Sequence, residues 1–375
     1  MTKAILTGII LIVLGCTLLV GCSAANGFDW SKLSTVKYTE NTYTVEGSFQ
    51  NISIEDDTAN IRLLPAQDGV CKIVCEESEQ ITYTISVDSD TLTVRINDAR
   101  KWYHHIGFFF GHTDLTVYLP ESEYKTLTVN ADTSDVTVPA DFSFGDLSIS
   151  LSTGNIVAEA SVSGKLYAEA STGNISVSNA APTSVSLSTS TGNITADTIQ
   201  ASGAFQAVAS TGRITLSNVT CNTAALNTST GDIQIFSLTA ADSFYAKSST
   251  GNHTFNGVTC AAATVSTTTG NQNYTDFSCT SAQLQASTGK IHMTNLVSSG
   301  HLQIQTDTGD ITFDRCDATS MNIKADTGDV KGTFRTPKII YTDTDTGKVN
   351  IPHSTEGGVC EIKTDTGDIN ITIAQ

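Results

Sequence analysis

Hydrophobic and polar residues alternate along most of this chain, and the alternation resets at regular intervals. Between residues 131 and 375, a Ser/Asp/Thr-Thr-Gly-polar tetrapeptide recurs every 19 or 20 residues. Apolar residues stand two, four and seven positions after its glycine, and again seven and five positions before it. Because a period of two indicates strands with one buried face, each repeat predicts two or three short strands joined by tight turns.

So constant a period predicts that each repeat is one coil of a β-solenoid, with like strands of successive coils stacked in parallel. We expect the repeat glycine to occupy a turn with positive φ, where a Cβ is penalised. Two-sided and three-sided coils both accommodate 19 or 20 residues. The twelve predicted turn glycines are Gly154, Gly173, Gly192, Gly212, Gly231, Gly251, Gly270, Gly289, Gly309, Gly328, Gly347 and Gly367.

The pattern divides the chain into three parts: an apolar leader at residues 1–26, an irregular β region at 27–130, and the regular array at 131–375. The fold prediction is an all-β protein, a single-chain parallel β-solenoid with coils of about 19–20 residues, preceded by an N-terminal apolar helix or leader. The last repeat strand ends only a few residues before Gln375. We therefore expect an exposed final coil, suited to end-to-end self-association.

The leader predicts export and tethering. Residues 4–25 carry no charge and are long enough to span a bilayer as a helix. Within them, residues 19–22 (LVGC) have the form of a lipobox, which predicts lipidation of Cys22. A transmembrane anchor and a lipoprotein both remain open, and either would place the rest of the chain on the extracellular face of a bacterial membrane.

The net charge argues against one class of partner, and the positions of the cysteines indicate their role. The chain carries 38 Asp and Glu against 20 Lys and Arg, a net charge of -18, which argues against a nucleic-acid partner. Cys221, Cys260 and Cys279 stand nine residues after a repeat glycine, where other copies have Ser or Ala. This position predicts buried, reduced thiols in the role of small apolar residues, although a bridge between Cys260 and Cys279 in adjacent coils stays open.

Two segments are candidate binding sites. The last copies carry acids on both sides of the turn, and stacked carboxylates either bind Ca²⁺ or form a solvated acidic edge; these acids are Asp307, Asp310, Asp326, Asp329, Asp365 and Asp368. The aromatic loop at residues 101–113 interrupts two strand patterns. It predicts either a plug for the N-terminal end or a partner-binding patch, with the candidate residues Trp102, Tyr103, Phe108, Phe109 and Phe110.

A family resemblance rests on three features: the Asn26–Trp30 juncture, the segments 51–54 (NISI) and 58–61 (TANI), and the serial STGxI and DTGDI repeats. Together they resemble the bacterial DUF4097 family of surface proteins with β-strand repeats, for which an adhesin role has been suggested. The resemblance implies no catalytic residues, and the LVGC lipobox departs from the family's usual anchor.

The expected function is therefore a non-enzymatic, envelope-tethered module for adhesion or display, facing an envelope protein, a glycan or a host surface. An envelope sensor or regulator that binds a peptide, lipid or partner protein is the alternative. A polysaccharide-active β-helix enzyme is a weaker one, because the scarce arginines of the array, Arg213, Arg315 and Arg335, stand at unrelated positions in the coil.

Overall fold

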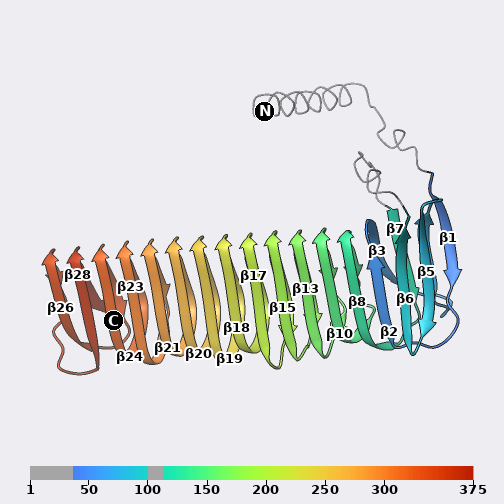
Figure 1. Ribbon diagram of the computed structural model, residues 1–375. Helices are drawn as coiled ribbons and strands as arrows, with labels where there is room; N and C mark the ends of the chain where they lie inside the picture. The colour runs from blue at the N-terminus through green and yellow to red at the C-terminus, as the bar shows by residue number, and fades with distance from the viewer. Residues whose placement is uncertain (1–36, 100–112, 375) are drawn as a thin grey trace, which may run out of the picture.

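The computed structural model describes residues 37–99 and 113–374, which form 29 β-strands along one rod (Figure 1). In these two ranges there is no helix long and apolar enough to cross a membrane. Every strand there belongs to one hydrogen-bonded sheet that winds around a common core. The predicted all-β parallel solenoid is confirmed, and the leader at residues 1–26 lies outside the described residues.

The strands fall into three groups along the chain. The N-terminal region contains β1 (Thr39–Thr44), β2 (Asn51–Asp56), β3 (Ala59–Pro65), β4 (Lys72–Glu77), β5 (Ile81–Asp88), β6 (Thr91–Asp98) and β7 (Thr113–Leu119). The first regular coils contain β8 (Glu123–Thr133), β9 (Val136–Val138), β10 (Ser143–Thr153), β11 (Ile156–Ala158), β12 (Ser161–Val162), β13 (Lys165–Thr172), β14 (Ile175–Ala180), β15 (Ser184–Thr191), β16 (Ile194–Gln200) and β17 (Ala204–Thr211). The remaining coils contain β18 (Ile214–Thr230), β19 (Ile233–Thr250), β20 (His253–Thr269), β21 (Gln272–Thr288), β22 (Ile291–Thr294), β23 (Val297–Thr308), β24 (Ile311–Thr327), β25 (Val330–Phe334), β26 (Lys338–Thr346), β27 (Val349–Asn350), β28 (Gly358–Thr366) and β29 (Ile369–Ile373).

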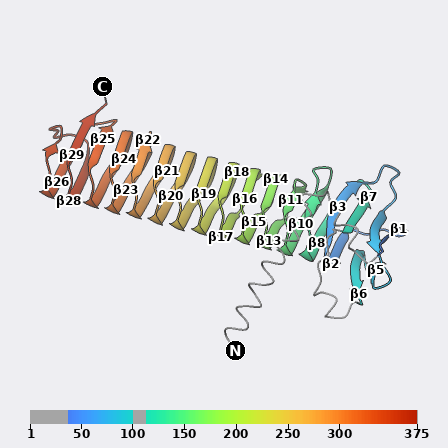
Figure 2. The ribbon, with the colours of Figure 1, turned by 90° about the horizontal axis from the view of Figure 1, so that it is seen from above.

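Each regular coil places one strand segment before the repeat glycine and one after it. Around Gly192, β15 leads into the turn and β16 leaves it. β15 pairs in parallel with β13 and β17, whereas β16 pairs with β14 and β18. The rod consequently has two rows of stacked segments, which run along its length in Figure 2.

The inward side chains form apolar ladders that hold the coils together. Two residues after the glycine, Ile175, Ile194 and Ile214 lie in register, and each is at most 1% exposed. Leu187 and Leu226 are buried equally deeply on the other row. Because full burial of such a side chain contributes about 1.5–3 kcal/mol, every coil adds stability only through contact with its neighbours.

A second bend lies six residues after the glycine, in the row that follows the turn. Here the backbone is left-handed in eight coils, at Asn179, Thr198, Asn218, Ser237, Gly257, Asp276, Asn295 and Arg315. Two consecutive residues point outward at this bend, between the inward positions four and seven after the glycine. The alternation in the sequence therefore breaks where one extra residue enters the strand, as in a β-bulge.

At both ends of the rod, the order of coils in space differs from their order in the chain. At the N-terminal end, β2 lies between β6 and β8, and β3 lies between β7 and β9. At the opposite end, β28 lies between β24 and β26, and β29 lies between β25 and β27 (Figure 1). The expectation that the last coil of the chain is exposed is therefore wrong, because residues 338–350 form the outermost coil instead.

A buried ion pair fastens this outermost coil. The Nζ of Lys338 contacts Oδ1 of Asp317 and donates to Oγ1 of Thr336 at 2.8 Å, and Lys338 is only 4% exposed. Thr336 in turn donates to Oδ2 of Asp317 at 2.9 Å. These contacts tie the beginning of β26 to the coil of β24, across the intervening β28.

Candidate functional site

The turn residues form a hydrogen-bonded ladder along one edge of the rod. Where Asn or Asp follows the glycine, its side-chain oxygen accepts the backbone N–H of the equivalent residue in the neighbouring coil, for example from Asn271 to Asn252 at 2.9 Å and from Asn174 to Asn155 at 3.0 Å. Asn and Asp can both supply this acceptor, which explains their exchange at this position. Arg213 and Lys290 each donate to the preceding Asn but cannot accept from the next coil.

Replacement of Asn252 by Ala should leave the Asn271 N–H without its protein acceptor. We expect a loss of about 1 kcal/mol in the free energy of unfolding, because the N–H lies at the exposed turn and can still bind water. Asn252→Asp keeps the acceptor and should remain close to the original stability. Thermal unfolding followed by circular dichroism measures both variants, and an equal loss in the two would contradict the role of the side-chain oxygen.

The acids of the C-terminal turns occupy two different environments. Asp310, Asp329 and Asp368 belong to the turn ladder: Asp310 accepts the N–H of Asp329 at 3.2 Å, and Asp329 accepts that of Asp368 at 2.7 Å. Lys290 lies 2.9 Å from Asp310 and Lys331 lies 2.6 Å from Asp329, and these ammonium groups lower the pKa of both carboxyls. The carboxylates are therefore held by N–H and ammonium donors of the chain.

The other three acids, Asp307, Asp326 and Asp365, lie on the outward side just before the turn, and Lys324 lies 2.7 Å from Asp326. Across residues 37–99 and 113–374, no group of three or more His, Cys, Asp or Glu side chains is arranged to hold a metal ion. Calcium binding by this edge stays a prediction. It is tested by measuring, at increasing calcium concentration, the melting temperature, which should rise if calcium binds.

The row of segments before the turns presents a continuous polar surface, which we call the ladder face. It is formed by the outward side chains of β6, β2, β8, β10, β13, β15 and β17, continued by the later halves of β18 to β21 and β24, and by β23, β28 and β26. Directly before each turn it carries an exposed threonine, in register from coil to coil. This threonine ladder comprises Thr133, Thr153, Thr172, Thr191, Thr211, Thr230, Thr250, Thr269, Thr288, Thr308, Thr327, Thr366 and Thr346. Its hydroxyls repeat at about 4.8 Å, the spacing of adjacent strands.

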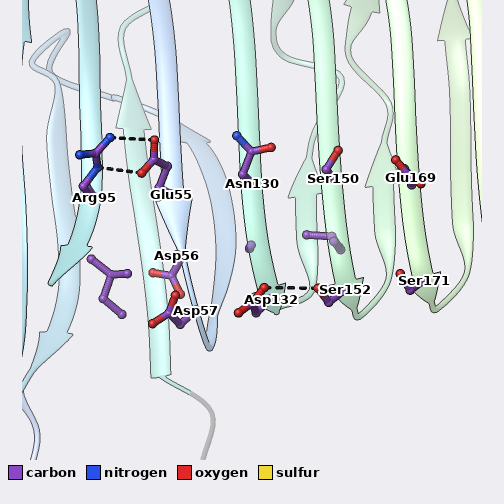
Figure 3. Close-up of a pocket in the computed structure, with 13 residues that line it drawn as sticks. Glu55, Asp56, Asp57, Arg95, Asn130, Asp132, Ser150, Ser152, Glu169 and Ser171 are labelled. Carbon is purple, nitrogen blue, oxygen red and sulfur yellow. Dashed lines mark hydrogen bonds and ion pairs between the residues drawn. The ribbon is translucent and has the colours of Figure 1, made fainter. Parts of the chain in front are cut away.

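The ladder face is hollowed near its N-terminal end by an open groove of about 710 Å³ across β6, β2, β8, β10 and β13 (Figure 3). One row of its lining runs through Arg95, Glu55, Asn130, Ser150 and Glu169, all in register. A second row, nearer the turns, contains Asp57, Asp132, Ser152 and Ser171. The groove is thus acidic and rich in hydroxyls.

The guanidinium of Arg95 in the groove forms an ion pair with Glu55. Nε of Arg95 lies 2.7 Å from Oε2 of Glu55, and Nη2 donates to Oε1 at 2.9 Å, so the guanidinium grips the carboxylate through two bonds. Both side chains are roughly half exposed, and an exposed pair of this kind contributes little stability. Its effect is to leave the carboxylates of Asp57, Asp132 and Glu169 as the excess charge of the groove.

One buried acid beside the groove was not predicted from the sequence. Asp56 is 4% exposed, and burial raises the pKa of its carboxyl. Oδ1 accepts the N–H groups of Thr58 and Ala59, while Oδ2 accepts the hydroxyl of Tyr83 at 2.5 Å. Both oxygens are occupied, so Asp56 closes the β2–β3 turn and fixes Tyr83 of β5 against it.

A second buried acid completes this N-terminal end. Glu77 accepts the N–H of Tyr83 at 2.6 Å, and its other oxygen accepts the hydroxyl of Tyr43 at 2.7 Å. The bond to Glu77 raises the pKa of Tyr43 to about 12. The two acids therefore bind the antiparallel strands β1, β4 and β5 to the first coils, and a sequence signal for them exists only in the turn motif Asp56-Asp57-Thr58.

A polar cluster lies inside the solenoid where the isoleucine ladder is interrupted. His253 and Gln272 occupy the position two residues after the glycine, and both are fully buried. Nε2 of His253 lies 2.8 Å from Oγ of Ser248, whereas its Nδ1 has no hydrogen-bond partner among the described residues. Oε1 of Gln272 accepts the hydroxyl of Tyr274 at 2.7 Å. In all other regular copies the residue two positions after the glycine is Ile or Val. The two polar residues at this position were therefore the sequence signal for a buried polar cluster.

The seven cysteines of the described ranges are all buried and unbridged, and these include Cys221, Cys260 and Cys279, for which the small-residue position predicted burial. Burial raises the pKa of Cys221 to about 11 and that of Cys260 to about 12. Since the thiolate is the reactive form, these groups are poor nucleophiles at neutral pH. Cys260 and Cys279 lie in register on adjacent strands but remain thiols.

The predicted turn glycines lie where the repeat placed them, and eleven of the twelve have φ between +132° and +157°, Gly347 being the exception. The structure therefore confirms the positive φ for all but that coil. The predicted lipidation site Cys22 and the candidate partner-binding residues Trp102, Tyr103, Phe108, Phe109 and Phe110 lie outside the described residues.

The serial STG and DTG turns stack in one parallel solenoid along the chain. The model of the family described as Toastrack DUF4097 matches residues 49–235 and 204–372. The chain belongs to the DUF4097 family. No protein with a curated description matches the chain.

Several solved structures similar to this DUF4097 chain come from Bacteroides and Parabacteroides species. A candidate adhesin of Bacteroides fragilis is 12% identical, with 91% of this chain and 98% of that chain covered and a TM-score of 0.26. A candidate adhesin of Parabacteroides distasonis is 11% identical, with 88% and 98% covered and a TM-score of 0.28. A protein of the same species, described as a candidate lipid-binding protein, is 12% identical, with 90% and 97% covered and a TM-score of 0.29. None of these three is named as an enzyme.

Proposed function

We propose that the protein is a non-enzymatic binding module, tethered to the bacterial envelope by its N-terminus, that adheres to a hydroxyl-rich surface through its ladder face. The observation that carries the proposal is the threonine ladder, an exposed row repeated in every regular coil. A row of identical hydroxyls offers equivalent donors and acceptors to a polymer such as a glycan of the envelope or of a host surface.

The strength of such binding comes from repetition. A single exposed hydroxyl contributes little, because it exchanges one partner, water, for another. Linked sites raise the effective concentration of each next contact, so a rigid row can bind a repeating polymer far more tightly than one coil would. The ladders of buried isoleucine and leucine supply that rigidity.

The contacts of Asp56 and of the Arg95–Glu55 pair support the non-enzymatic part of the proposal. An active site needs a general acid or base with a free oxygen or nitrogen facing the substrate. Asp56 has the raised pKa expected of such a group, but its oxygens are held by Tyr83 and by two backbone N–H groups. The Arg95–Glu55 pair is likewise engaged.

Replacement of Thr230, Thr250 and Thr269 together by Val should weaken adhesion and preserve the fold. Valine keeps the β-branched shape and removes three adjacent hydroxyls of the ladder. We expect retention of cells that display the full chain, on immobilised polysaccharide, to fall by roughly tenfold, since three weak contacts are lost from one row. The matched triple replacement by Ser keeps the hydroxyls and should retain adhesion.

An equal loss in the Val and Ser variants would contradict recognition by hydroxyls. Undiminished retention of the Val variant would remove the ladder face from the proposal. Capture of a single envelope protein, with no retention on polysaccharide, would favour the sensor role instead.

A further inference from the structure

The far end of the rod carries a free sheet edge, and the proposed adhesion does not use the backbone groups of that edge. β26 pairs with β28 on one side only, and no other described strand lies on its second side. Figures 1 and 2 place this edge at the opposite end of the rod from β1. An edge strand presents unpaired N–H and C=O groups that can accept another strand.

The tip is also where exposed apolar side chains gather. Three of the large apolar residues that are most exposed lie on its coils: Tyr341 at 60%, Val349 at 45% and Val359 at 41%. Ile340 and Ile351 of the outermost coil are only partly buried. The core of the solenoid thus reaches the tip without a closing layer in the described ranges, whereas at the other end the two rows continue into the antiparallel strands β1, β4 and β5.

We propose that the β26 edge pairs with the β26 edge of a second copy, in antiparallel orientation about a two-fold axis at Thr342, so that two rods join tip to tip. The inference rests on the proposed tethering, since N-terminal tethers place the tips of chains on two facing envelopes toward each other. In this arrangement the second copy belongs to another cell, and the pair links the two cells.

The sequence of β26 is self-complementary in this register. With a two-fold axis at Thr342, each residue before position 342 pairs with the residue of the second copy that lies equally far after it. Paired side chains lie on the same face of the sheet, so Tyr341 lies opposite Asp343 of the second copy on the outer side. On the inner side, Ile340 lies opposite Thr344 of the second copy. No like charges lie directly opposite each other, although β26 contains two aspartates, because Asp345 faces Ile339 of the second copy.

A tail-to-head arrangement fits the molecule less well. The opposite end of the rod ends in β1 and β5, and the tether precedes β1 in the chain. A tip that bound the N-terminal end of another rod would have to approach the envelope to which that rod is tethered. Two tips on facing envelopes meet without this obstacle. An isologous contact also closes on itself and leads to a pair rather than a filament.

Opposite charges introduced at Tyr341 test this register. Tyr341→Asp places Asp opposite Asp343 on both sides of the axis, whereas Tyr341→Lys places Lys there, and both variants lose the same exposed ring. The assay mixes two differently labelled cell populations that display the full chain and counts two-colour aggregates. We expect the Asp variant to form roughly tenfold fewer aggregates than the original, and the Lys variant to aggregate at least as well.

The matched controls are Tyr245→Asp and Tyr245→Lys, which change the same residue type in the equivalent row in the middle of the rod. These two should aggregate like the original chain, which separates the tip contact from general repulsion between acidic rods. Equal effects of Asp and Lys at residue 341, or equal effects at residues 245 and 341, would overturn the proposal.

Failure here is distinguishable from failure of the proposed adhesion. If tip pairing is absent, cells still bind polysaccharide through the threonine ladder, and the Tyr341 variants form as many mixed aggregates as the Tyr245 variants and the original chain. If the ladder face does not bind, the Thr230, Thr250 and Thr269 variants leave retention on polysaccharide unchanged, whatever the aggregation assay shows.

Discussion

Gly212→Ala should destabilise the rod by about 3–5 kcal/mol, a large fraction of the stability of a typical domain. A Cβ on Gly212 would meet the carbonyl oxygen of Gly192 in the preceding coil at 1.8 Å, and φ at this residue is +147°. The coil must therefore move away from its neighbour, which breaks the turn ladder and separates the buried apolar ladders on both sides.

Gly257→Ala is the matched control for this variant. Gly257 also has a positive φ, +68°, but a Cβ there would approach no atom closer than 3.7 Å. Other coils place Asn, Ser, Thr, Asp or Arg at the equivalent bend. We expect a loss of only about 1 kcal/mol, the ordinary cost of a left-handed residue. Thermal and urea unfolding compare the two, and similar losses would show that backbone conformation, not the contact between coils, requires the glycine.

Lowering the pH from about 6.5 to about 4 should cost the folded protein about 3 kcal/mol through His253 alone. Burial lowers the pKa of this imidazole from 6.5 to about 4. The unfolded chain therefore binds a proton at His253 at higher pH than the folded chain does, so stability falls as the pH drops through this window and is regained above it. Below about 4 both states are protonated, and the loss is complete.

His253→Ile should remove this pH dependence, because other coils bury isoleucine at the same position. At neutral pH the variant should be at least as stable as the original, since the Nδ1 atom without a partner is gone. His292→Gln, at an exposed position, is the control for the loss of a histidine as such. Carboxylates also titrate in this range, so the measured quantity is the difference between the unfolding profiles of the original chain and the His253 variant. Parallel profiles would contradict the argument.

The repeat predicted the coil and its turn, because every coil must solve the same packing problem with the same few residues. Three residues of the turn each meet one constraint. Gly leaves room for the carbonyl of the adjacent coil, the Thr before it forms the exposed threonine row, and the Asn or Asp after it supplies the acceptor for the neighbouring coil. The left-handed bend six residues after the glycine was not predicted, because Asn, Ser, Thr, Asp and Arg all occur there and no single residue type marks it.

The order of the end coils could not be read from the repeat, because residues 338–350 and 358–373 carry the same DTG motif. The inward side chains of the two coils explain which of them lies outermost. Cys360, Ile362 and Ile369 fill the inner positions of the last coil and are at most 1% exposed. The preceding coil has Ile340, Thr342 and Val349 at the paired positions. Thr342 in place of isoleucine makes its inner row less apolar, so the last coil takes the place with neighbours on both sides.

The polar residues of the site were harder to predict than the core. Asp56, Glu77 and His253 are buried by contacts between segments distant in sequence, and no local pattern shows which polar residue will find partners. The acidic turns show the reverse: their charge is plain in the sequence, but the structure shows backbone N–H groups and lysines at Asp310 and Asp329.

The most direct test of the central claim is the retention of cells that display the full chain on a polysaccharide-coated surface, compared with cells that lack it. The measurement should include the length of the polysaccharide recovered afterwards. Binding without chemistry predicts strong retention and polysaccharide of unchanged length. No gain in retention would contradict adhesion through the ladder face, and shortened polysaccharide would show that the protein is an enzyme.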